Sequence, residues 1–130
     1  MRIEAALFCV LLTGCAAHGT DVEEARSGSE LTLALAGKSA GARQGCVNLR
    51  EIESTRPVDG GTAILFVERG GTTYLNRPHG TCQASPGGFV RTGSTSAQLC
   101  RGDSVQIVGP AGVVGDSCTL TDFIPYRRAG

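Results

Sequence analysis

Hydrophobic and polar positions alternate along much of the chain from residue 46 onward, a pattern that predicts short β-strands. The strongest strand is Thr62–Glu68, which is apolar on both faces and is expected to lie inside a sheet. A tight Arg69–Gly71 turn leads to a second strand over Thr72–Asn76, because glycine supplies the positive φ of such turns. Ile52 is out of phase with the strand before it, which indicates a bulge or bend near Arg50. The other expected strands are Cys46–Leu49, Phe89–Arg91, Ser104–Val108 and Cys118–Ile124.

Glycine, proline and small polar residues separate these strands. Turns are expected at Pro57–Gly61, Asn76–Gly80, Ser85–Gly88 and Gly109–Gly115, and loops at Lys38–Gly45 and Gly93–Gln98. Pro125 is expected to follow the last strand. Five or six short antiparallel strands with glycine turns predict an all-β fold, a small barrel or sandwich.

One short helix is expected before the strands. Ser29 can cap a helix over Glu30–Ala36, and Gly37 can end it. Leu31 and Leu35 share one face of this helix, with Ala34 beside them. The helix is therefore expected to cover one end of the β core.

The N-terminal region has the form of a bacterial lipoprotein signal. The apolar stretch Ala5–Leu12 is shorter than the roughly 20 residues of a membrane-spanning helix and suits a signal-peptide core. It ends in Leu12-Thr13-Gly14-Cys15, which resembles a lipobox, although Glu4 makes the leading region less positive than usual. The resemblance implies cleavage before Cys15 and diacylation of its thiol. Ordinary secretory cleavage near Ala16 or Ala17 is one alternative, and a buried N-terminal helix is another.

This interpretation divides the chain into a lipoprotein signal peptide (residues 1–14), a flexible acidic tether (residues 15–29) and a single β domain (residues 30–127). It places the protein in the bacterial cell envelope, lipid-anchored and facing the periplasm. Ala16 follows Cys15, which by resemblance to well-studied envelopes favours the outer membrane. A soluble periplasmic or secreted protein is the alternative.

The cysteine count agrees with export. Loss of Cys9 with the signal peptide and lipidation of Cys15 leave four cysteines in the domain: Cys46, Cys82, Cys100 and Cys118. Four thiols in an oxidising compartment favour two disulfides, which would stabilise a small domain that has few aromatic residues. A zinc site is the competing use, but the four form no C-x-x-C pair, and His18 and His79 lack ligand spacing. We therefore expect no metal.

Charge excludes one class of partner. The chain has 12 basic and 12 acidic residues, so its formal net charge is zero. From Arg43 onward nine arginines face seven acidic residues, a small excess compared with the basic footprint of nucleic-acid-binding domains. We expect no nucleic-acid partner.

Candidate chemistry is sparse. Catalysis by His79 would need a nucleophile and an orienting acid, and no nucleophile elbow or free-thiol pair accompanies it, so a turn histidine is the simpler interpretation. The Arg101–Asp103 tripeptide and Asp59 are interpreted as turns in which the carboxylate accepts hydrogen bonds from backbone amides. Four arginines would form a basic strip if their strands align: Arg50, Arg56, Arg77 and Arg91. Nothing predicts a cofactor.

A dispersed pattern covers roughly Leu31 to Tyr126. Its segments are Cys46-Val47, Arg50-Glu51-Ile52, Ser54–Asp59, Ile64-Leu65-Phe66, Tyr74–Arg77, Leu99–Asp103, Cys118–Leu120 and Phe123–Tyr126. Together they resemble a family of small bacterial envelope proteins that has no assigned activity and therefore implies no catalytic residue. Relatives with two domain cysteines place them like Cys82 and Cys118. The resemblance thus implies pairing of Cys82 with Cys118 and of Cys46 with Cys100; Cys82 with Cys100 and Cys46 with Cys118 is the main rival.

These features favour a non-enzymatic envelope lipoprotein, a binding or structural module held to the membrane through Cys15, with another envelope protein as its partner. One alternative is a secreted inhibitor of a lysozyme or protease, which only the architecture supports. Another is a small-ligand carrier, which needs an unfilled barrel interior. The least favoured is a small hydrolase around His79, Asp103 and nearby serines, which needs a pocket where these side chains meet.

Overall fold

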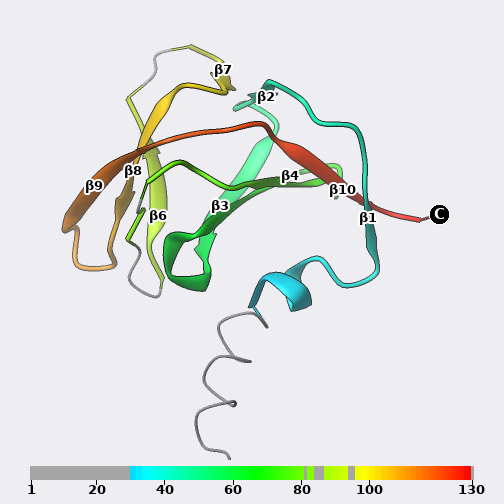
Figure 1. Ribbon diagram of the computed structural model, residues 1–130, viewed down its shortest axis with the longest axis horizontal. Helices are drawn as coiled ribbons and strands as arrows, with labels where there is room; N and C mark the ends of the chain where they lie inside the picture. The colour runs from blue at the N-terminus through cyan, green and yellow to red at the C-terminus, as the bar shows by residue number, and fades with distance from the viewer. Residues whose placement is uncertain (1–29, 81, 84–86, 94–95, 130) are drawn as a thin grey trace, which may run out of the picture.

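Antiparallel strands dominate the computed structural model, which describes residues 30–80, 82–83, 87–93 and 96–129 (Figure 1). A five-stranded sheet has the order β1-β10-β5-β4-β3, a three-stranded sheet has the order β6-β8-β9, and β2 pairs with β7. The bounds are β1 Lys38–Ala40, β2 Cys46–Asn48, β3 Ile52–Val58, β4 Ala63–Glu68, β5 Thr73–Asn76, β6 Phe89–Thr92, β7 Gln98–Cys100, β8 Ser104–Val108, β9 Val114–Thr119 and β10 Ile124–Arg128. The predicted all-β class, with a short helix and two disulfides, is confirmed.

The strand predicted to lie inside a sheet is β4, and that prediction is confirmed. It pairs with β3 on one side and with β5 on the other, so both of its edges are used. Its first four residues, Ala63 to Phe66, are buried. Side chains on both faces of β4 leave water, which explains why both faces are apolar.

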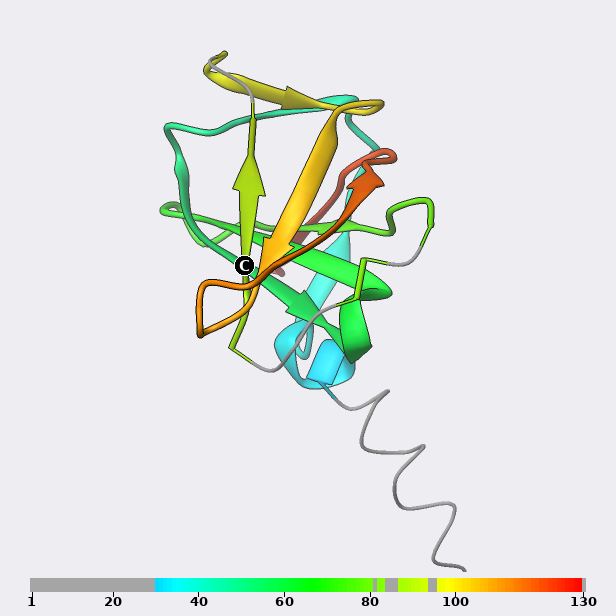
Figure 2. The ribbon, with the colours of Figure 1, turned by 90° about the vertical axis from the view of Figure 1, so that its left-hand side faces the viewer.

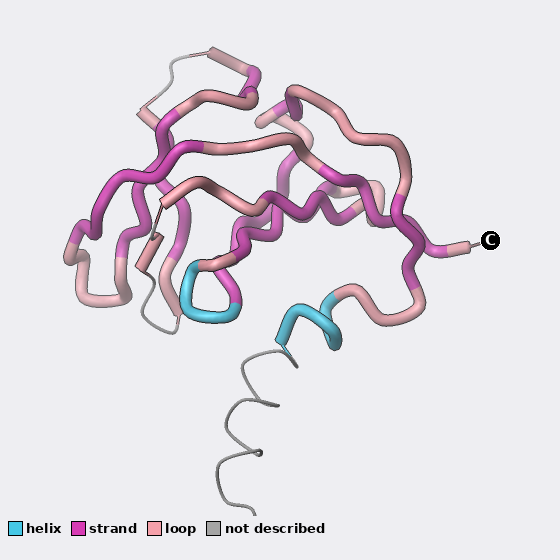
Figure 3. The backbone as a smooth tube through the Cα atoms, viewed as in Figure 1, coloured by secondary structure: helices cyan, strands magenta, loops and turns pink. Residues whose placement is uncertain are grey.

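The two larger sheets curve around one core (Figure 2). At one seam, the N–H of Val90 in β6 donates a hydrogen bond of 3.2 Å to Oγ1 of Thr55 in β3. At the other, His79, which follows β5, forms an isolated antiparallel bridge with Thr119 in β9. Figure 3 shows that β9 and β10 follow one continuous path, joined by a short loop. The two sheets therefore enclose one interior as a partly open barrel, because their edges meet through isolated contacts and not through a continuous ladder.

The barrel interior is packed with side chains. Phe66 and Phe123, both fully buried, make an edge-to-face contact with ring centroids 5.4 Å apart. The other buried members of this cluster are Val47, Ile64, Tyr74, Cys82, Leu99, Val105, Ile107, Cys118 and Leu120. Side chains thus occupy the space that a small-ligand carrier would need to keep open.

The helical segment 30–34 covers the outer face of the five-stranded sheet. Leu31, Ala34 and Leu35 pack there against a second cluster, which contains Leu65 and Leu75. Gly37 has a φ of 74°, the left-handed conformation in which helices commonly end. The predicted helix and its apolar face are confirmed, although the helix ends at residue 34 and residues 35–37 form a turn, whereas Ala36 was the expected end. The proposed cap, Ser29, lies outside the described residues.

Two disulfides join the domain cysteines, Cys46 with Cys100 and Cys82 with Cys118, the pairing that the family resemblance implies. Cys46 and Cys100 face each other across β2 and β7, with Cα atoms 4.0 Å apart. The neighbouring N–H of Arg101 bonds to the carbonyl of Gly45 at 2.7 Å, so the two cysteines form a non-hydrogen-bonded pair. Such pairs bring side chains closest together.

The prolines were predicted wrongly as strand limits. Pro57 was assigned to a turn, but it lies within β3, which is an edge strand of its sheet. Pro125 was expected to follow the last strand, but it lies within β10 and opposite Tyr74. Just beyond β1, the N–H of Gly41 donates to the carbonyl of Pro125 at 2.7 Å, but Pro125 has no N–H to return the bond, so regular β1–β10 pairing stops there. Proline is tolerated at the edge of a sheet, as at Pro57, and where a ladder ends, as at Pro125.

Strand limits differ elsewhere as well, and the described residues contain ten strands rather than five or six. Residues 38–40, predicted as loop, form β1 because β10 offers them a free edge. The expected strand over Cys118–Ile124 is divided between β9 and β10. The bend near Arg50 is present as a turn, with a register shift between Ile52 and Ser54. Part of the Ser85–Gly88 turn and of the Gly93–Gln98 loop lies outside the described residues.

Candidate functional site

His79 and Asp103 are not joined into a catalytic pair. His79 is exposed, and its backbone N–H donates to the carbonyl of Thr119 at 2.9 Å. Its imidazole makes no hydrogen bond with any part of the chain that the structure describes. The Asp103 carboxylate is engaged elsewhere, since Oδ2 accepts the N–H of Cys100 at 2.7 Å. The orienting contact that histidine catalysis needs is therefore not formed between these two residues.

The Arg101–Asp103 tripeptide is a turn between β7 and β8, as predicted. The N–H of Asp103 donates back to the carbonyl of Cys100 at 3.0 Å, and the Asp103 carboxylate closes the turn from its other side. Gly102 has a φ of 90°, which only glycine adopts without strain. The acidic side chain therefore faces its own backbone.

The turn predicted at Asp59 is present over Asp59–Gly61, but Oδ1 of its carboxylate does not make the expected contact. Its side chain was expected to accept hydrogen bonds from backbone amides, but its Oδ1 is buried and has no partner among the described residues. Asp59 has a φ of 51°, in the left-handed region that aspartate tolerates better than most residues. Its backbone stabilises the turn instead: the N–H donates to Oε2 of Glu30 at 3.0 Å, and the carbonyl accepts the Thr62 hydroxyl at 3.0 Å.

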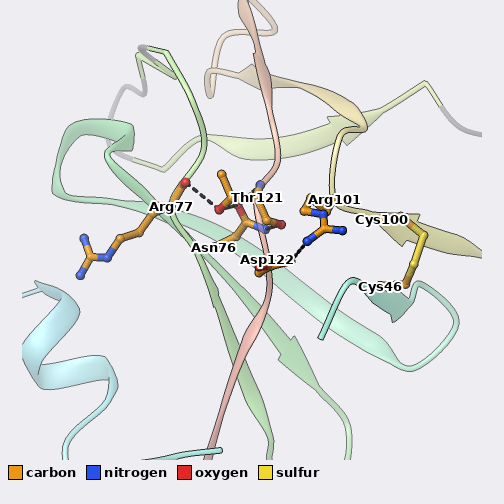
Figure 4. Close-up of polar contacts among 7 residues, drawn as sticks. All are labelled: Cys46, Asn76, Arg77, Cys100, Arg101, Thr121 and Asp122. Carbon is orange, nitrogen blue, oxygen red and sulfur yellow. Dashed lines mark hydrogen bonds and ion pairs between the residues drawn. A yellow bond between two sulfur atoms is a disulfide. The ribbon is translucent and has the colours of Figure 1, made fainter. Parts of the chain in front are cut away.

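A buried polar clamp joins the end of β5 to the loop before β10 (Figure 4). Asn76 is fully buried, and its Nδ2 donates to the carbonyl of Thr121 at 2.8 Å. Its Oδ1 accepts the N–H of Thr121 at 3.0 Å, so the side chain imitates a strand partner where regular pairing stops. The Thr121 hydroxyl also donates to the carbonyl of Arg77 at 2.8 Å. The sequence predicts Asn76 only as the end of a hairpin and does not predict its contact with Thr121. The one sequence signal for that contact is a polar residue in a strand that is otherwise buried.

The charged pair beside this clamp lies at the surface. Arg101 Nη1 is 3.0 Å from Oδ1 of Asp122, close to the Cys46–Cys100 disulfide (Figure 4). The Arg101 side chain is 66% exposed, so solvent screens this ion pair and it contributes little to stability. The Asn76–Thr121 clamp, the Arg101–Asp122 ion pair and the Cys46–Cys100 disulfide together hold chain segments in place at one end of the barrel. Their role is to support the fold.

Tyr74 has a pKa that its surroundings shift clearly. Its hydroxyl donates to Oε2 of Glu68 at 2.8 Å. Burial raises the pKa of Tyr74 above its usual value of 10.0, and the hydrogen bond and negative charge of Glu68 raise it further. The phenol is therefore held neutral, as a hydrogen-bond donor.

The four arginines of the predicted strip are exposed, but the structure places them on different elements. Arg56 and Lys38 line a hollow of about 250 Å³ on the outer face of the five-stranded sheet. Arg91 lines a separate hollow of about 340 Å³ over β6, β8 and β9. The structure shows no shared groove for Arg56 and Arg91.

A further hollow of about 520 Å³ lies between the turn after β3 and the β8–β9 hairpin. Glycines make up much of its lining, and its polar side chains are Gln83 and Asp116, both exposed. Convergent buried polar groups, which commonly mark a ligand site, are not among the residues that line it.

The described ranges contain no cluster of three or more histidine, cysteine, aspartate or glutamate side chains arranged to bind a metal. Within these ranges, no helix has the length and apolar character to span a membrane. Cys15 and His18 lie outside the described residues.

Comparison of the chain with protein-family models, with curated proteins and with solved structures finds no match. The resemblance to the envelope family therefore stays a prediction.

Proposed function

We propose that this chain is a bacterial envelope lipoprotein whose disulfide-linked β domain is a non-enzymatic binding module. In this proposal the signal peptide is removed before Cys15, the Cys15 thiol carries a diacylglyceryl group, and residues 15–29 tether the domain to the membrane. The outer membrane, facing the periplasm, is the proposed location.

The observation that carries the proposal is how the chain uses its cysteines. All four cysteines from residue 30 onward pair with one another, as Cys46–Cys100 and Cys82–Cys118. Disulfides of this kind persist in oxidising compartments, which supports export. Because the domain needs no further thiol, Cys15, in its lipobox-like string, is free for lipid attachment.

A binding role is favoured over catalysis by the geometry around the candidate residues. The Asp103 carboxylate is committed to a backbone amide, and His79 is exposed without a side-chain partner in the described chain. A rigid domain on a tether can instead hold or stabilise another envelope protein. Reversible crosslinking in intact envelopes followed by affinity purification should recover one reproducible partner, and repeated recovery of none would count against the binding role.

The anchor is tested by processing in cells. Globomycin, which inhibits lipoprotein signal peptidase, is expected to make the wild-type chain accumulate as a larger precursor. Cys15→Ala should abolish both the shift and the incorporation of labelled fatty acid. Cys9→Ala is the matched control, since it removes a cysteine of the same region and should leave both readouts intact. Equal behaviour of the two variants would overturn the lipoprotein proposal.

A further inference from the structure

The large hydrophobic side chains that are exposed in the described residues lie on elements at one end of the domain. They are Leu33, Phe89, Val113 and Val114, with exposed fractions of 73%, 51%, 71% and 45%. Leu33 belongs to the helical segment 30–34, Phe89 begins β6, and the other two lie at the turn between β8 and β9. We call these four residues the apolar end patch.

Figures 1 and 2 are related by a rotation about the vertical axis, so height in the two views can be compared. In both views the helical segment, the start of β6 and the β8–β9 turn lie toward the lower end of the domain. The described chain also begins at this end, at Glu30, whereas β2 and β7 lie at the opposite end. The apolar end patch is thus on the side that the predicted tether joins.

Part of the patch is built into the three-stranded sheet. Phe89 is registered with Val108, and Val108 is registered with Val114, so these side chains form a cross-strand row on one face. Val108 is 6% exposed, and the side chains on either side of it project to solvent. Because β-strand pairing fixes this row, its exposure is a property of the fold.

Charge near the patch is mixed. Leu33 shares a hollow with Glu30 and Arg56, while Asp116 follows shortly after Val114. No single sign of charge dominates, so attraction to a partner would come mainly from burial of apolar side chains. The acyl region of a membrane is deformable and can surround apolar side chains that come from three separate elements. A protein partner would need a pocket shaped to fit all of them.

We propose that the apolar end patch rests on the membrane surface and inserts its side chains at the boundary between headgroups and acyl chains. This inference rests on the proposed anchor at Cys15. Residues 15–29 span at most about 50 Å when fully extended, so the anchor keeps the domain close to the lipid. The end that joins the tether faces the membrane most often, and apolar side chains there leave water on contact. The opposite end, with β2 and β7, then faces the periplasm.

Tryptophan fluorescence can test this orientation, because the chain contains no tryptophan. The full-length lipidated protein, carrying either Val113→Trp or Phe89→Trp, is reconstituted into phosphatidylcholine vesicles with and without brominated acyl chains. Gln98→Trp is the control, since Gln98 is exposed in β7 at the opposite end. Brominated lipid should lower the emission of the two patch probes about two-fold, because their rings lie at the acyl boundary, and should leave the control unchanged.

Flotation of the same vesicles separates the two proposals. If the protein floats with the vesicles and neither patch probe is quenched more than the Gln98→Trp control, the membrane contact is overturned while the anchor stands. If emission of the patch probes shifts only on addition of envelope protein, the patch binds protein and the lipid proposal is again overturned. Failure of the wild-type protein to float would overturn the anchor itself.

Discussion

Asn76 shows at the scale of one residue how this small barrel is held together. The residue is fully buried, yet both ends of its amide are paired with the backbone of Thr121, through bonds of 2.8 and 3.0 Å. A buried amide costs free energy unless it is hydrogen-bonded. Here the same two bonds also give hydrogen-bond partners to the N–H and carbonyl of Thr121 in the facing loop. The residue thus replaces two ladder bonds at the point where β5 ends.

Asn76→Ala is expected to lower the free energy of unfolding by about 2 to 3 kcal/mol, because it leaves the N–H and carbonyl of Thr121 without partners in a partly buried place. Urea unfolding of the oxidised protein measures this. Arg77→Ala is the control: the side chain is exposed, and alanine keeps the carbonyl that Thr121 uses, so the change should stay within about 0.5 kcal/mol. Equal stability of the two variants would contradict the clamp.

Tyr74 gives a pH-dependent expectation. Burial and the contact with Glu68 raise its pKa above 10.0 in the folded state, so the folded protein keeps the phenol proton more tightly than the unfolded chain. The stabilisation is fully present below about pH 10, the unfolded pKa, and is lost as pH rises through the folded pKa.

Titration of phenolate absorbance should therefore place Tyr74 above 10.0 in the folded protein. The chain has two tyrosines, so Tyr126→Phe isolates the signal of Tyr74. Glu68→Gln should lower the pKa of Tyr74 from that of the Tyr126→Phe background, because it removes a negative charge next to the phenol. An unchanged titration would argue against the Glu68 contact.

At the scale of elements, the sequence predicts what local pattern determines and misses what pairing determines. The β4 strand is recognisable because residues on both faces are apolar, and the helix because Leu31 and Leu35 recur at helical spacing. Residues 38–40 show no alternation and become β1 only by pairing with β10. Pro57 indicates a turn locally, yet it is acceptable in a strand at a sheet edge.

The same division applies to the candidate site. The turn role of Asp103 follows from its residue type and position, because aspartate commonly accepts from nearby amides. The Asn76–Thr121 clamp joins residues 45 positions apart, and no local pattern identifies such a contact. The apolar end patch likewise depends on how helix, β6 and the β8–β9 turn come together in space.

The helix offers a matched pair of substitutions. Leu35 packs against the outer cluster of the five-stranded sheet, so Leu35→Ala is expected to destabilise the protein by about 2 kcal/mol through lost burial. Leu33 is 73% exposed, so Leu33→Ala should change stability by less than about 0.5 kcal/mol. Thermal or urea unfolding of both variants checks this. A larger effect of Leu33→Ala than of Leu35→Ala would show that the opposite face of the helix packs against the sheet.

The two disulfides differ in access to solvent. Cys82 and Cys118 are 0% and 3% exposed, whereas Cys46 and Cys100 are partly exposed. Mild reduction should therefore open Cys46–Cys100 first, since the attacking thiolate must reach a sulfur atom. Alkylation after timed reduction, followed by peptide mapping, reports the order. Early labelling of Cys82 and Cys118 in folded protein would be inconsistent with their burial.

Each disulfide is also expected to contribute to stability through the loop that it closes. The bridges have sequence separations of 54 and 36, for which the chain-entropy model gives about 4 kcal/mol each. Loss of both is comparable with the whole stability of a small domain, so the fully reduced chain should be largely unfolded.

At the scale of the whole molecule, the proposed anchor and the disulfides support one account. In this proposal, the packed barrel turns its exposed apolar side chains toward the membrane, at the end where residue 30 lies, and leaves its other end for a periplasmic partner. Export would account for the paired cysteines, and lipidation would give Cys15 a use outside the pairing.

The intact mass of the mature protein, purified from membranes without reduction and treated with an alkylating reagent, tests this account most directly. The account requires a chain that begins at Cys15, carries the mass of a diacylglyceryl group and takes up no alkyl label, since all its thiols are bonded. A mature chain that begins after Cys15, without lipid, would contradict the anchor. Uptake of alkyl label by the folded domain would contradict the complete pairing of its four cysteines.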